Sequence, residues 1–254
     1  MNRDLIYLVS EDWYFLSHRL TLAKNAMDRG YIIHVICKDT GMINEIKRHG
    51  FKYYGLKSSR NNTSIFNVAK EIFNIRLIIK KIKPSIIHLV AFRSILLGLS
   101  SLVFINNIKI VSSITGMGSI FLSKKLKIKL LKYAIIIFLF INFRRKSNTI
   151  IVQNKDDYNF FLKKFKINKN KIFLIRGSGV NINHFQYMKE PSINPIIVTF
   201  VGRLIKDKGI ETLFSAFKKV SAVNKSINLL IAGDIDVSNP SAISKNYIDQ
   251  ELKE

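Results

Sequence analysis

A basic loop between a hydrophobic strand and a helix is the first place where chemistry can be read from residue types. The strand starts at Ile196 and ends at Gly202-Arg203, and Lys208-Gly209 opens the helix that follows. A guanidinium, an ammonium and free backbone N–H groups then lie close together, an arrangement that suits a diphosphate. An ordinary strand–loop–helix connection with solvated cations has the same pattern, so the spacing alone only suggests a phosphate site.

A second group of reactive side chains follows the first predicted strand. Within Ser10–Arg19 the sequence has carboxylates, hydroxyls, the only tryptophan (Trp13), an imidazole (His18) and a guanidinium (Arg19). Aromatic rings beside polar groups suit sugar faces and hydroxyls, although a helix start with a hydrophobic staple explains the same residues. The loop lacks the glycines of a dinucleotide fingerprint, which argues against a Rossmann-type cofactor here.

A third candidate is a turn that follows a later strand. Gly116 and Gly118 would let a ligand approach the backbone, and Thr115 offers a hydroxyl. A tight turn without a ligand is an equally simple explanation. His88, which ends another predicted strand, occupies a position where a lone histidine is more often structural.

The motifs give no sign of cofactor chemistry. The sequence has no Walker loop and no G-x-S-x-G elbow. Cys37, the only cysteine, excludes an internal disulfide and predicts a small core residue in a reducing compartment. The start of the chain has no cleavable signal pattern, so a cytoplasmic location is expected. The five histidines are His18, His34, His49, His88 and His184. Their spacing is not that of metal ligands, so no metal is expected.

The net charge of +24 calls for an anionic partner, although biased composition accounts for part of it. No nucleic-acid-binding signature is present, so nucleic acid is not an expected partner. Residues 124–146 carry cations around an apolar middle, Leu130–Phe143, which is shorter than the roughly 20 residues of a membrane-spanning helix. An interfacial helix on a membrane and a simple core helix both fit this segment. Its cations are Lys124, Lys125, Lys127, Lys129, Lys132, Arg144, Arg145 and Lys146.

Short apolar runs separated by helix-length segments predict a doubly wound α/β domain. Strands that are apolar on both faces are typical of a parallel sheet covered on two sides. The predicted strands are Leu5–Val9, Ile32–Cys37, Ile86–Val90, Ile110–Ile114, Thr149–Val152 and Ile172–Ile175. The predicted helices are Phe15–Arg29, Ile65–Lys81, Leu96–Phe104, Leu122–Phe143 and Lys155–Phe165. Ligands of such folds bind beyond the carboxyl ends of the strands, where the candidate loops lie.

A stretch rich in asparagine and proline predicts a domain boundary. We expect an N-terminal Rossmann-like domain over 1–180, a linker over 181–195 and a second domain over 196–254. About 45 residues follow Lys208, enough for a helix near 209–222, a strand near Ile227–Ala232 and a polar tail. A self-sufficient α/β domain needs on the order of 100 residues. The second Rossmann-like domain is therefore expected to be incomplete.

The ordered set of motifs resembles the retaining glycosyltransferases of family 4, which have the GT-B fold of two Rossmann-like domains. The set most resembles the subgroup that builds O-antigen, capsule or other lipid-linked glycans. The matching segments are Trp13–Arg19, Thr115–Gly118, Ile150–Asn154, Gly177–Asn181, Val201–Gly209 and Leu230–Asp234.

The resemblance implies roles for the candidate residues. Arg203 and Lys208, with Gly202, would hold the diphosphate of a nucleoside-diphosphate sugar, without a metal or another cofactor. The reaction would move a hexose or N-acetylhexosamine, with retention, to a polyprenyl-diphosphate-linked glycan acceptor. The enzyme would be peripheral on the inner face of the cytoplasmic membrane, with the cations of 124–146 in contact with lipid. The acceptor and cleft residues would be Trp13, His18, Arg19, Thr115, Gly116 and Gly118.

The sequence departs from the family pattern in one respect. Family members carry two glutamates separated by seven residues, beyond the point where this chain ends. The catalytic residues are therefore unknown, and we expect a truncated chain that is inactive or impaired by itself. Two alternatives stay open: a sugar-nucleotide epimerase of the same fold, and a non-catalytic accessory chain that depends on a partner.

Overall fold

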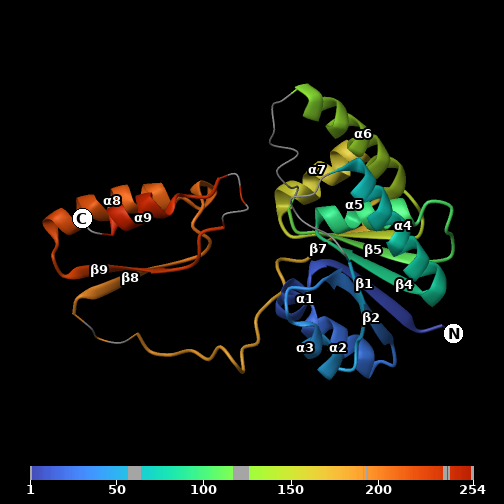
Figure 1. The fold of residues 1–254 in the computed structure, drawn as a ribbon, viewed down its shortest axis with the longest axis horizontal. Coiled ribbons are helices and arrows are strands. Elements are labelled where there is room, and N and C mark those ends of the chain that lie inside the picture. The colour runs from blue at the N-terminus through green and yellow to red at the C-terminus, as the bar shows by residue number, and fades with distance from the viewer. Residues whose placement is uncertain are drawn as a thin grey trace. The chain divides into compact units, whose positions relative to one another are not determined.

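The computed structural model divides into two compact units, Met1–Asn181 and Ile182–Glu254 (Figure 1). It describes residues 2–56, 64–116, 126–190, 192, 194–236, 239 and 241–252, with only the backbone described over 126–132.

Within its described residues, the first unit is built on a parallel sheet with the strand order β3-β2-β1-β4-β5-β6-β7. The strands are β1 (Asp4–Glu11), β2 (Ile32–Lys38), β3 (Lys52–Gly55), β4 (Ile86–Val90), β5 (Lys109–Ile114), β6 (Asn148–Val152) and β7 (Ile172–Leu174). The order reverses between β1 and β4, where Leu5 pairs with both Ile33 and Ile86. In open α/β sheets, ligands bind beside the carboxyl ends of the strands at such a reversal.

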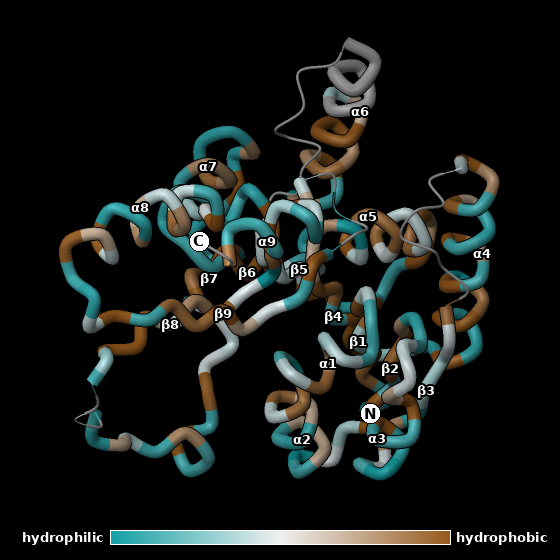
Figure 2. Tube along the Cα trace, turned by 60° about the vertical axis from the view of Figure 1, so that its left-hand side comes forward, coloured by the Kyte–Doolittle hydropathy of each residue, from teal (hydrophilic) through white to brown (hydrophobic). Residues whose placement is uncertain are grey.

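Helices cover both faces of this sheet (Figure 1). One face carries α1 (Asp12–His18), α2 (Leu20–Asp28) and α3 (Ile43–Arg48). The other carries α4 (Ile65–Ile82), α5 (Phe92–Ser101), α6 (Leu126–Phe143) and α7 (Lys155–Phe165). The strands are hydrophobic along most of their length, whereas the outer helices alternate between apolar and polar residues (Figure 2). This distribution is what a sheet buried on both faces requires, and it confirms the predicted fold class.

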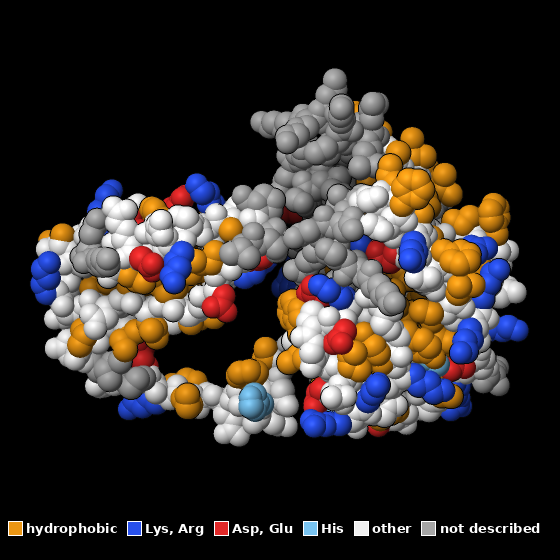
Figure 3. All heavy atoms as spheres, in the orientation of Figure 1, with side chains coloured by type: hydrophobic (Ala, Val, Ile, Leu, Met, Phe, Trp, Pro, Cys, Tyr) orange, Lys and Arg blue, Asp and Glu red, His pale blue; other side chains and the backbone are white. Residues whose placement is uncertain are grey.

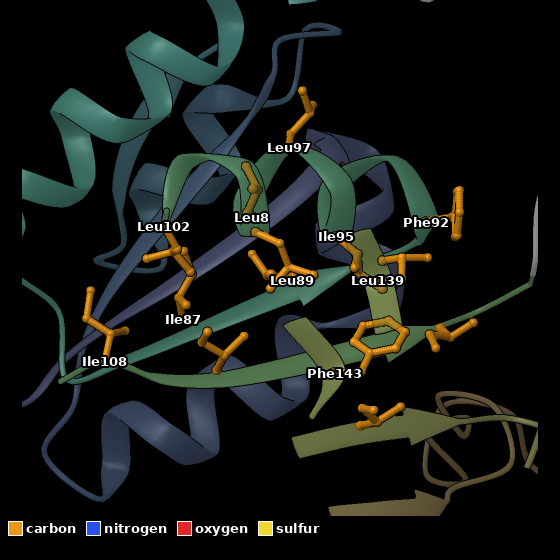
Figure 4. Close-up of a cluster of buried hydrophobic side chains, with 14 of the residues drawn as sticks. Leu8, Ile87, Leu89, Phe92, Ile95, Leu97, Leu102, Ile108, Leu139 and Phe143 are labelled. Atoms are coloured by element: carbon orange, nitrogen blue, oxygen red, sulfur yellow. The ribbon is translucent and has the colours of Figure 1, made fainter. Parts of the chain in front are cut away.

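The larger core cluster shows how these layers meet (Figure 4). Leu8 of β1 and Leu89 of β4 pack with Ile95 of α5, and Leu139 and Phe143 of α6 lie over the neighbouring strands. All five side chains are buried, and burying one side chain of this size contributes about 1.5–3 kcal/mol. The inner half of α6 is therefore a core element, as one of the two predictions for this segment required.

Three local predictions for the first unit need correction. The helix predicted over Phe15–Arg29 is broken at Arg19, which has φ −129° and ψ −9°. The helix predicted over Leu96–Phe104 is α5, which begins at Phe92 and ends at Ser101. Strand β3 and helix α3 were missed because both are short and β3 is half-exposed at the sheet edge. For the helix predicted from Leu122, residues 122–125 lie outside the described part of the chain.

The second unit contains two parallel strands, β8 (Ile196–Val201) and β9 (Ile227–Ala232), in the residues that the structure describes. Helix α8 (Ile210–Val223) packs on them, with a small core that includes Leu204, Ile210 and Phe214. The predicted polar tail is wrong in part, because α9 (Lys245–Glu251) forms there and buries Ile248. The hydroxyl of Ser244 accepts a hydrogen bond from the N–H of Tyr247 (3.3 Å) and caps that helix.

Candidate functional site

Asp12 fixes the loops at the carboxyl ends of β1 and β2. It is fully buried at the start of α1, and its Oδ2 accepts hydrogen bonds from the N–H groups of Thr40 (2.8 Å) and Met42 (2.9 Å). Its Oδ1 accepts from the N–H of Trp13 (2.7 Å) and from the Thr40 hydroxyl. Burial alone would raise the pKa of this carboxyl, but these hydrogen bonds outweigh burial and lower it. Asp12 is therefore a charged anchor that ties the two loops together.

Two of the predicted cleft residues lie on α1 and are accessible. Trp13 is 41% exposed, and its indole N–H donates to Glu11 Oε2 (2.7 Å). His18 is exposed and stacks on Tyr14, with ring centroids 4.3 Å apart and an interplanar angle of 11°. The Ser17 hydroxyl lies 2.6 Å from Nδ1 of His18 and 2.8 Å from the carbonyl oxygen of Trp13. The helix thus presents aromatic rings and polar atoms together, and a sugar-binding role for them stays a prediction.

Arg19, the third residue predicted on this segment, is buried where α1 and α2 are separated. Its side chain donates from Nη1 to the carbonyl oxygen of His18 (2.9 Å) and to the Ser178 hydroxyl in the loop after β7 (2.9 Å). Among the described residues no carboxylate pairs with it, and its buried Nε has no hydrogen-bond partner. Burial lowers the pKa of this guanidinium, while Tyr14 and Tyr7 raise it. An arginine stays protonated in proteins, so a full positive charge is held in the interior.

The groups around Arg19 supply no counter-charge. His88 is buried and hydrogen-bonded through Nε2 to the Ser113 hydroxyl (2.7 Å). Burial, with the nearby charge of Arg19, lowers the pKa of His88 to about 3, so the imidazole is neutral at pH 7. Burial raises the pKa of Tyr7 to about 12, so its phenol is neutral as well. His88 therefore has a structural role within the sheet.

The turn after β5 places Thr115 half-buried and Gly116 exposed. These residues follow the strand directly, at the same edge of the sheet as the loops after β1 and β4. Gly118 lies outside the described residues. The structure therefore gives the position of the first two predicted residues of this turn and no contact for them.

The sequence reasoning missed an ion pair at this edge of the sheet. Glu71 of α4 is buried, and its Oε2 lies 2.6 Å from Nη2 of Arg93 at the start of α5. These two side chains line a small cavity with Glu11 and Lys38, beside the ends of β1 and β2. Glu71 lies in a helix and pairs with a residue 22 positions away, so neither spacing nor local pattern could have found it.

In the second unit, the predicted phosphate loop joins β8 to α8. Gly202 and Arg203 follow β8, and Gly209 precedes α8, as predicted. Nη1 of Arg203 lies 2.7 Å from Oδ2 of Asp236, and the Arg203 side chain is 56% exposed. Lys208 has no acidic partner among the described residues, whereas its neighbour Lys206 pairs with an acidic side chain. The loop therefore holds one unpaired ammonium and one guanidinium whose partner a ligand would have to replace.

Of the predicted membrane-contact cations, the described ones lie at the end of α6. Arg144 and Lys146 are exposed, and the Arg144 guanidinium carbon lies 5.0 Å from the centroid of the Phe140 ring. Arg145 is half-buried and donates weakly to Asn142 Oδ1 (3.4 Å). Lys124 and Lys125 lie outside the described residues, and so do the side chains of Lys127, Lys129 and Lys132.

The described residues contain neither a cluster of metal ligands nor a membrane-spanning helix. No group of three or more histidine, cysteine or acidic side chains within them could hold a metal ion. No helix in the same part of the chain has both the length and the hydropathy to cross a membrane.

These features define a class. A parallel Rossmann-like unit with its candidate loops at the carboxyl edge, followed by part of a second parallel unit with a basic strand–helix loop, is GT-B-like. A family model described as glycosyl transferase 4-like matches residues 4–154, more than half of the chain. The chain therefore belongs to this family, which confirms the resemblance at the level of the family.

Solved structures of the same fold are similar over the whole chain. A glycosyltransferase from Rickettsia africae has a TM-score of 0.67 at 20% identity, with 99% of this chain and 64% of that one covered. Sucrose-phosphate synthase from Thermosynechococcus elongatus has a TM-score of 0.71 at 15% identity, covering 99% of this chain and 67% of that one. Anabaena HepE, solved with UDP and glucose, has a TM-score of 0.64 at 15% identity, with 100% of this chain and 65% of that one covered. The chain thus spans about two thirds of these structures.

The fold is not confined to glycosyltransferases. A Listeria monocytogenes structure assigned as a UDP-N-acetylglucosamine 2-epimerase shares the fold. It has a TM-score of 0.64 at 8% identity, with 100% of this chain and 66% of that one covered. A search of curated proteins gave no match.

Proposed function

We propose that this protein acts in a glycosyl transfer from a nucleoside-diphosphate sugar to a lipid-linked glycan acceptor. The single observation that carries the proposal is the family match over residues 4–154, which covers the first unit from β1 to the end of β6. The transferred group is proposed to be a hexose or N-acetylhexosamine, transferred with retention as in the family that the motifs resemble. No metal is invoked, because fixed cations can stabilise a departing diphosphate.

The donor diphosphate is assigned to the loop between β8 and α8. Arg203 and Lys208 lie on this loop and are exposed, and Gly202 precedes them at the end of β8. Anabaena HepE and a Staphylococcus aureus protein of the same fold were solved with UDP or UDP-glucose, which supports a uridine nucleotide as the first donor to test. On binding, the diphosphate would replace the carboxylate of Asp236 as the partner of the Arg203 guanidinium. Both groups present anionic oxygens that accept hydrogen bonds from this guanidinium.

The acceptor is assigned to the first unit, at the carboxyl edge of its sheet. Trp13 and His18 present an exposed indole and imidazole there, and Thr115 with Gly116 follow β5 at the same edge. Aromatic and hydroxyl groups of this kind bind sugars through ring faces and hydrogen bonds.

A lipid-linked acceptor requires contact with a membrane, and the outer surface of α6 supports such contact. Tyr133, Ile137 and Ile141 recur at intervals of four residues and are each more than half exposed, so they form one apolar stripe. The helix has no acidic residue, and Arg144 and Lys146 follow it. Apolar side chains beside cations are typical of helices that lie on anionic lipid.

Helix α4, which covers the same face of the sheet as α6, has a similar outer surface. Phe73 and Leu77 are exposed on it, together with Lys70, Lys80 and Lys81. Its one acidic residue, Glu71, is buried, so the described outer surface of α4 is apolar and basic. Figure 3 shows hydrophobic side chains gathered over α4 and α6, with lysine and arginine side chains between them. We assign these outer faces to peripheral contact with the inner face of the cytoplasmic membrane.

Donor binding by the 254-residue chain tests the proposal. Titration with UDP-glucose and UDP-N-acetylglucosamine should show binding that Arg203→Ala and Lys208→Ala each weaken by about tenfold or more, since a charge-assisted hydrogen bond contributes about 1.5–3 kcal/mol. Lys206→Ala is the matched control, because this lysine lies on the same loop but pairs with Glu211 (3.1 Å). It should change binding by less than about twofold. Binding of neither nucleotide, or equal loss in all three variants, would contradict the assignment.

Products separate the remaining functions. A transferase would give a labelled lipid product from a radiolabelled UDP-sugar and a short-chain prenyl-diphosphate-linked glycan. The rate is expected to be low, because impaired activity is expected of this chain by itself, and NMR of the product's anomeric proton should show retention. An epimerase would instead convert the UDP-sugar in the absence of any acceptor. Donor binding without either product would favour the accessory chain that depends on a partner.

A further inference from the structure

Arg19 is a buried charge without a counter-charge. Its exposed fraction is 7%, and no carboxylate among the described residues pairs with it. The titratable neighbours Tyr7 and His88 are both neutral at pH 7, as their pKa values of about 12 and about 3 require. Removing an ion from water costs several kcal/mol unless an opposite charge and hydrogen bonds compensate. The charge of Arg19 is therefore not compensated by any acid in the described part of the first unit.

The hydrogen bonds of Arg19 leave a defined set of donors free. A guanidinium has five N–H donors, of which Nη1 uses two, on the carbonyl oxygen of His18 and the hydroxyl of Ser178. The Nε–H is buried without a partner among the described residues. The Nε–H and one Nη2–H of an arginine lie parallel on one side of the fork, where they match two oxygens of a carboxylate or phosphate. The unused side of Arg19 is thus the side that binds an oxyanion in a bidentate manner.

The loop that Arg19 contacts has room for a ligand. Ser178 is flanked by Gly177 and Gly179, whose φ angles of +67° and +72° lie in the left-handed region. Apart from the adjoining residues, no atom of the described part of the chain lies within 4 Å of the position that a Cβ would take at either glycine. Consecutive backbone N–H groups in such turns form anion-binding concavities. A guanidinium, a hydroxyl and an open glycine backbone therefore come together where the end of α1 meets the loop after β7.

We propose that Arg19, with Ser178, binds a phosphate or diphosphate group where the end of α1 meets the loop after β7. The chemistry is that of a phosphorylated ligand, and assigning the group to the prenyl-diphosphate of the acceptor rests on the proposed function. In this region the other assigned residues contact the sugar of the acceptor. Arg19 would bind the negatively charged diphosphate of the same acceptor.

A purely structural arginine is the competing explanation, since Arg19 also ties the loop after β7 to α1. Three substitutions separate the two roles. Arg19→Gln removes the charge, Arg19→Lys keeps the charge but loses the fork, and Ser178→Ala removes one contact of the loop. Arg29→Gln is the matched control, because Arg29 is an exposed arginine at the end of the same pair of helices.

The test is titration of the full chain with inorganic pyrophosphate, farnesyl diphosphate and UDP, by isothermal calorimetry. Circular dichroism should show that each variant is folded. We expect pyrophosphate binding to weaken by tenfold or more in Arg19→Gln and by severalfold in Arg19→Lys, and to change by less than twofold in Arg29→Gln. If Arg19→Gln does not fold, Arg19→Lys and Ser178→Ala carry the test, and both should weaken binding. Wild-type affinity in folded Arg19 variants, or no diphosphate binding by the wild-type chain, would overturn the proposal.

The arms of the titration identify the source of the phosphate. Loss of farnesyl diphosphate binding with UDP binding retained assigns the site to the acceptor, and the reverse result assigns it to the donor nucleotide. Pyrophosphate binding that depends on Arg19 would stand even if no sugar transfer is found, so a failure of the proposed function is distinguishable from a failure of this site.

Discussion

Replacing Asp12 by alanine should loosen the loops after β1 and β2 and destabilise the first unit. The carboxylate accepts hydrogen bonds from the backbone N–H groups of Trp13, Thr40 and Met42 and from one hydroxyl. A hydrogen bond to a charged group contributes about 1.5–3 kcal/mol, and a donor left unsatisfied in a buried position costs about 1–3 kcal/mol. Thr40 and Met42 are themselves exposed, so water can replace part of this loss. We therefore expect the free energy of unfolding to fall by about 2–4 kcal/mol.

Asp12→Asn tests whether the charge and both oxygens matter. Whichever way the amide is turned, its NH₂ group faces a backbone donor, because Oδ2 serves Thr40 and Met42 and Oδ1 serves Trp13. The expected loss is about 1–3 kcal/mol, smaller than for alanine. Asp39→Asn is the control in the same loop, since this exposed carboxylate accepts one hydrogen bond, from the N–H of Gly41. It should change stability by less than about 1 kcal/mol.

The assay is urea unfolding followed by the fluorescence of Trp13, which is the only tryptophan and adjoins the substituted residue. Because the folded pKa of Asp12 is lowered, its contribution is complete above the unfolded pKa of about 3.9 and is lost as pH falls through the folded value. The difference between wild type and Asp12→Ala should therefore be constant from pH 5 to 7 and shrink below about pH 4. A loss under about 1 kcal/mol at pH 7 would refute the anchoring role.

Three further outcomes are expected. Gly233→Ala should abolish hydrogen-exchange protection of β8 and β9 but not of the first unit, because a Cβ there would lie 1.8 Å from a backbone oxygen. Wild-type stability should fall as pH drops from about 6.5 towards 4.5, since unfolding lets His88 take up a proton. His88→Gln should reduce this loss in urea-melt series, and the buried His34, whose pKa is also lowered, should account for a remaining part. The double substitution of Phe73→Ser and Leu77→Ser removes two exposed apolar side chains from α4 and should lower binding to phosphatidylglycerol vesicles about tenfold in flotation assays. The exposed Leu22 lies on α2, so Leu22→Ser should not lower this binding.

The strands could be predicted because burial on both faces leaves an unambiguous record in the sequence. β1 and β4 are continuous apolar runs, since helices cover them on two sides. The elements that were missed lack this record. Strand β3 is a four-residue edge strand with half-exposed tyrosines, and α9 buries a single residue of a polar segment. Their formation depends on neighbours that a local pattern does not contain.

The break at Arg19 escaped prediction for a different reason. The apolar spacing from Phe15 onward is compatible with one helix, and no glycine or proline interrupts it. The Ser17 hydroxyl lies within hydrogen-bonding distance of the Trp13 carbonyl oxygen, and such contacts bend helices. The contact of Arg19 with Ser178 joins residues 159 positions apart. Residue types could therefore single out Arg19, whose role in a cleft stays a prediction, while its burial and its lack of a paired acid among the described residues come from the tertiary structure.

The net charge of +24 and the single charge of Arg19 differ as indicators of function. Most of the excess cations are solvated, so they cost little and biased composition alone can accumulate them. A buried guanidinium without an acid is costly in every molecule that carries it. Selection or drift can leave a surface lysine in place without a ligand, whereas the interior charge of the first unit is stable only with compensation. The position of an anionic partner is therefore indicated more strongly by one buried cation than by the overall charge of the chain.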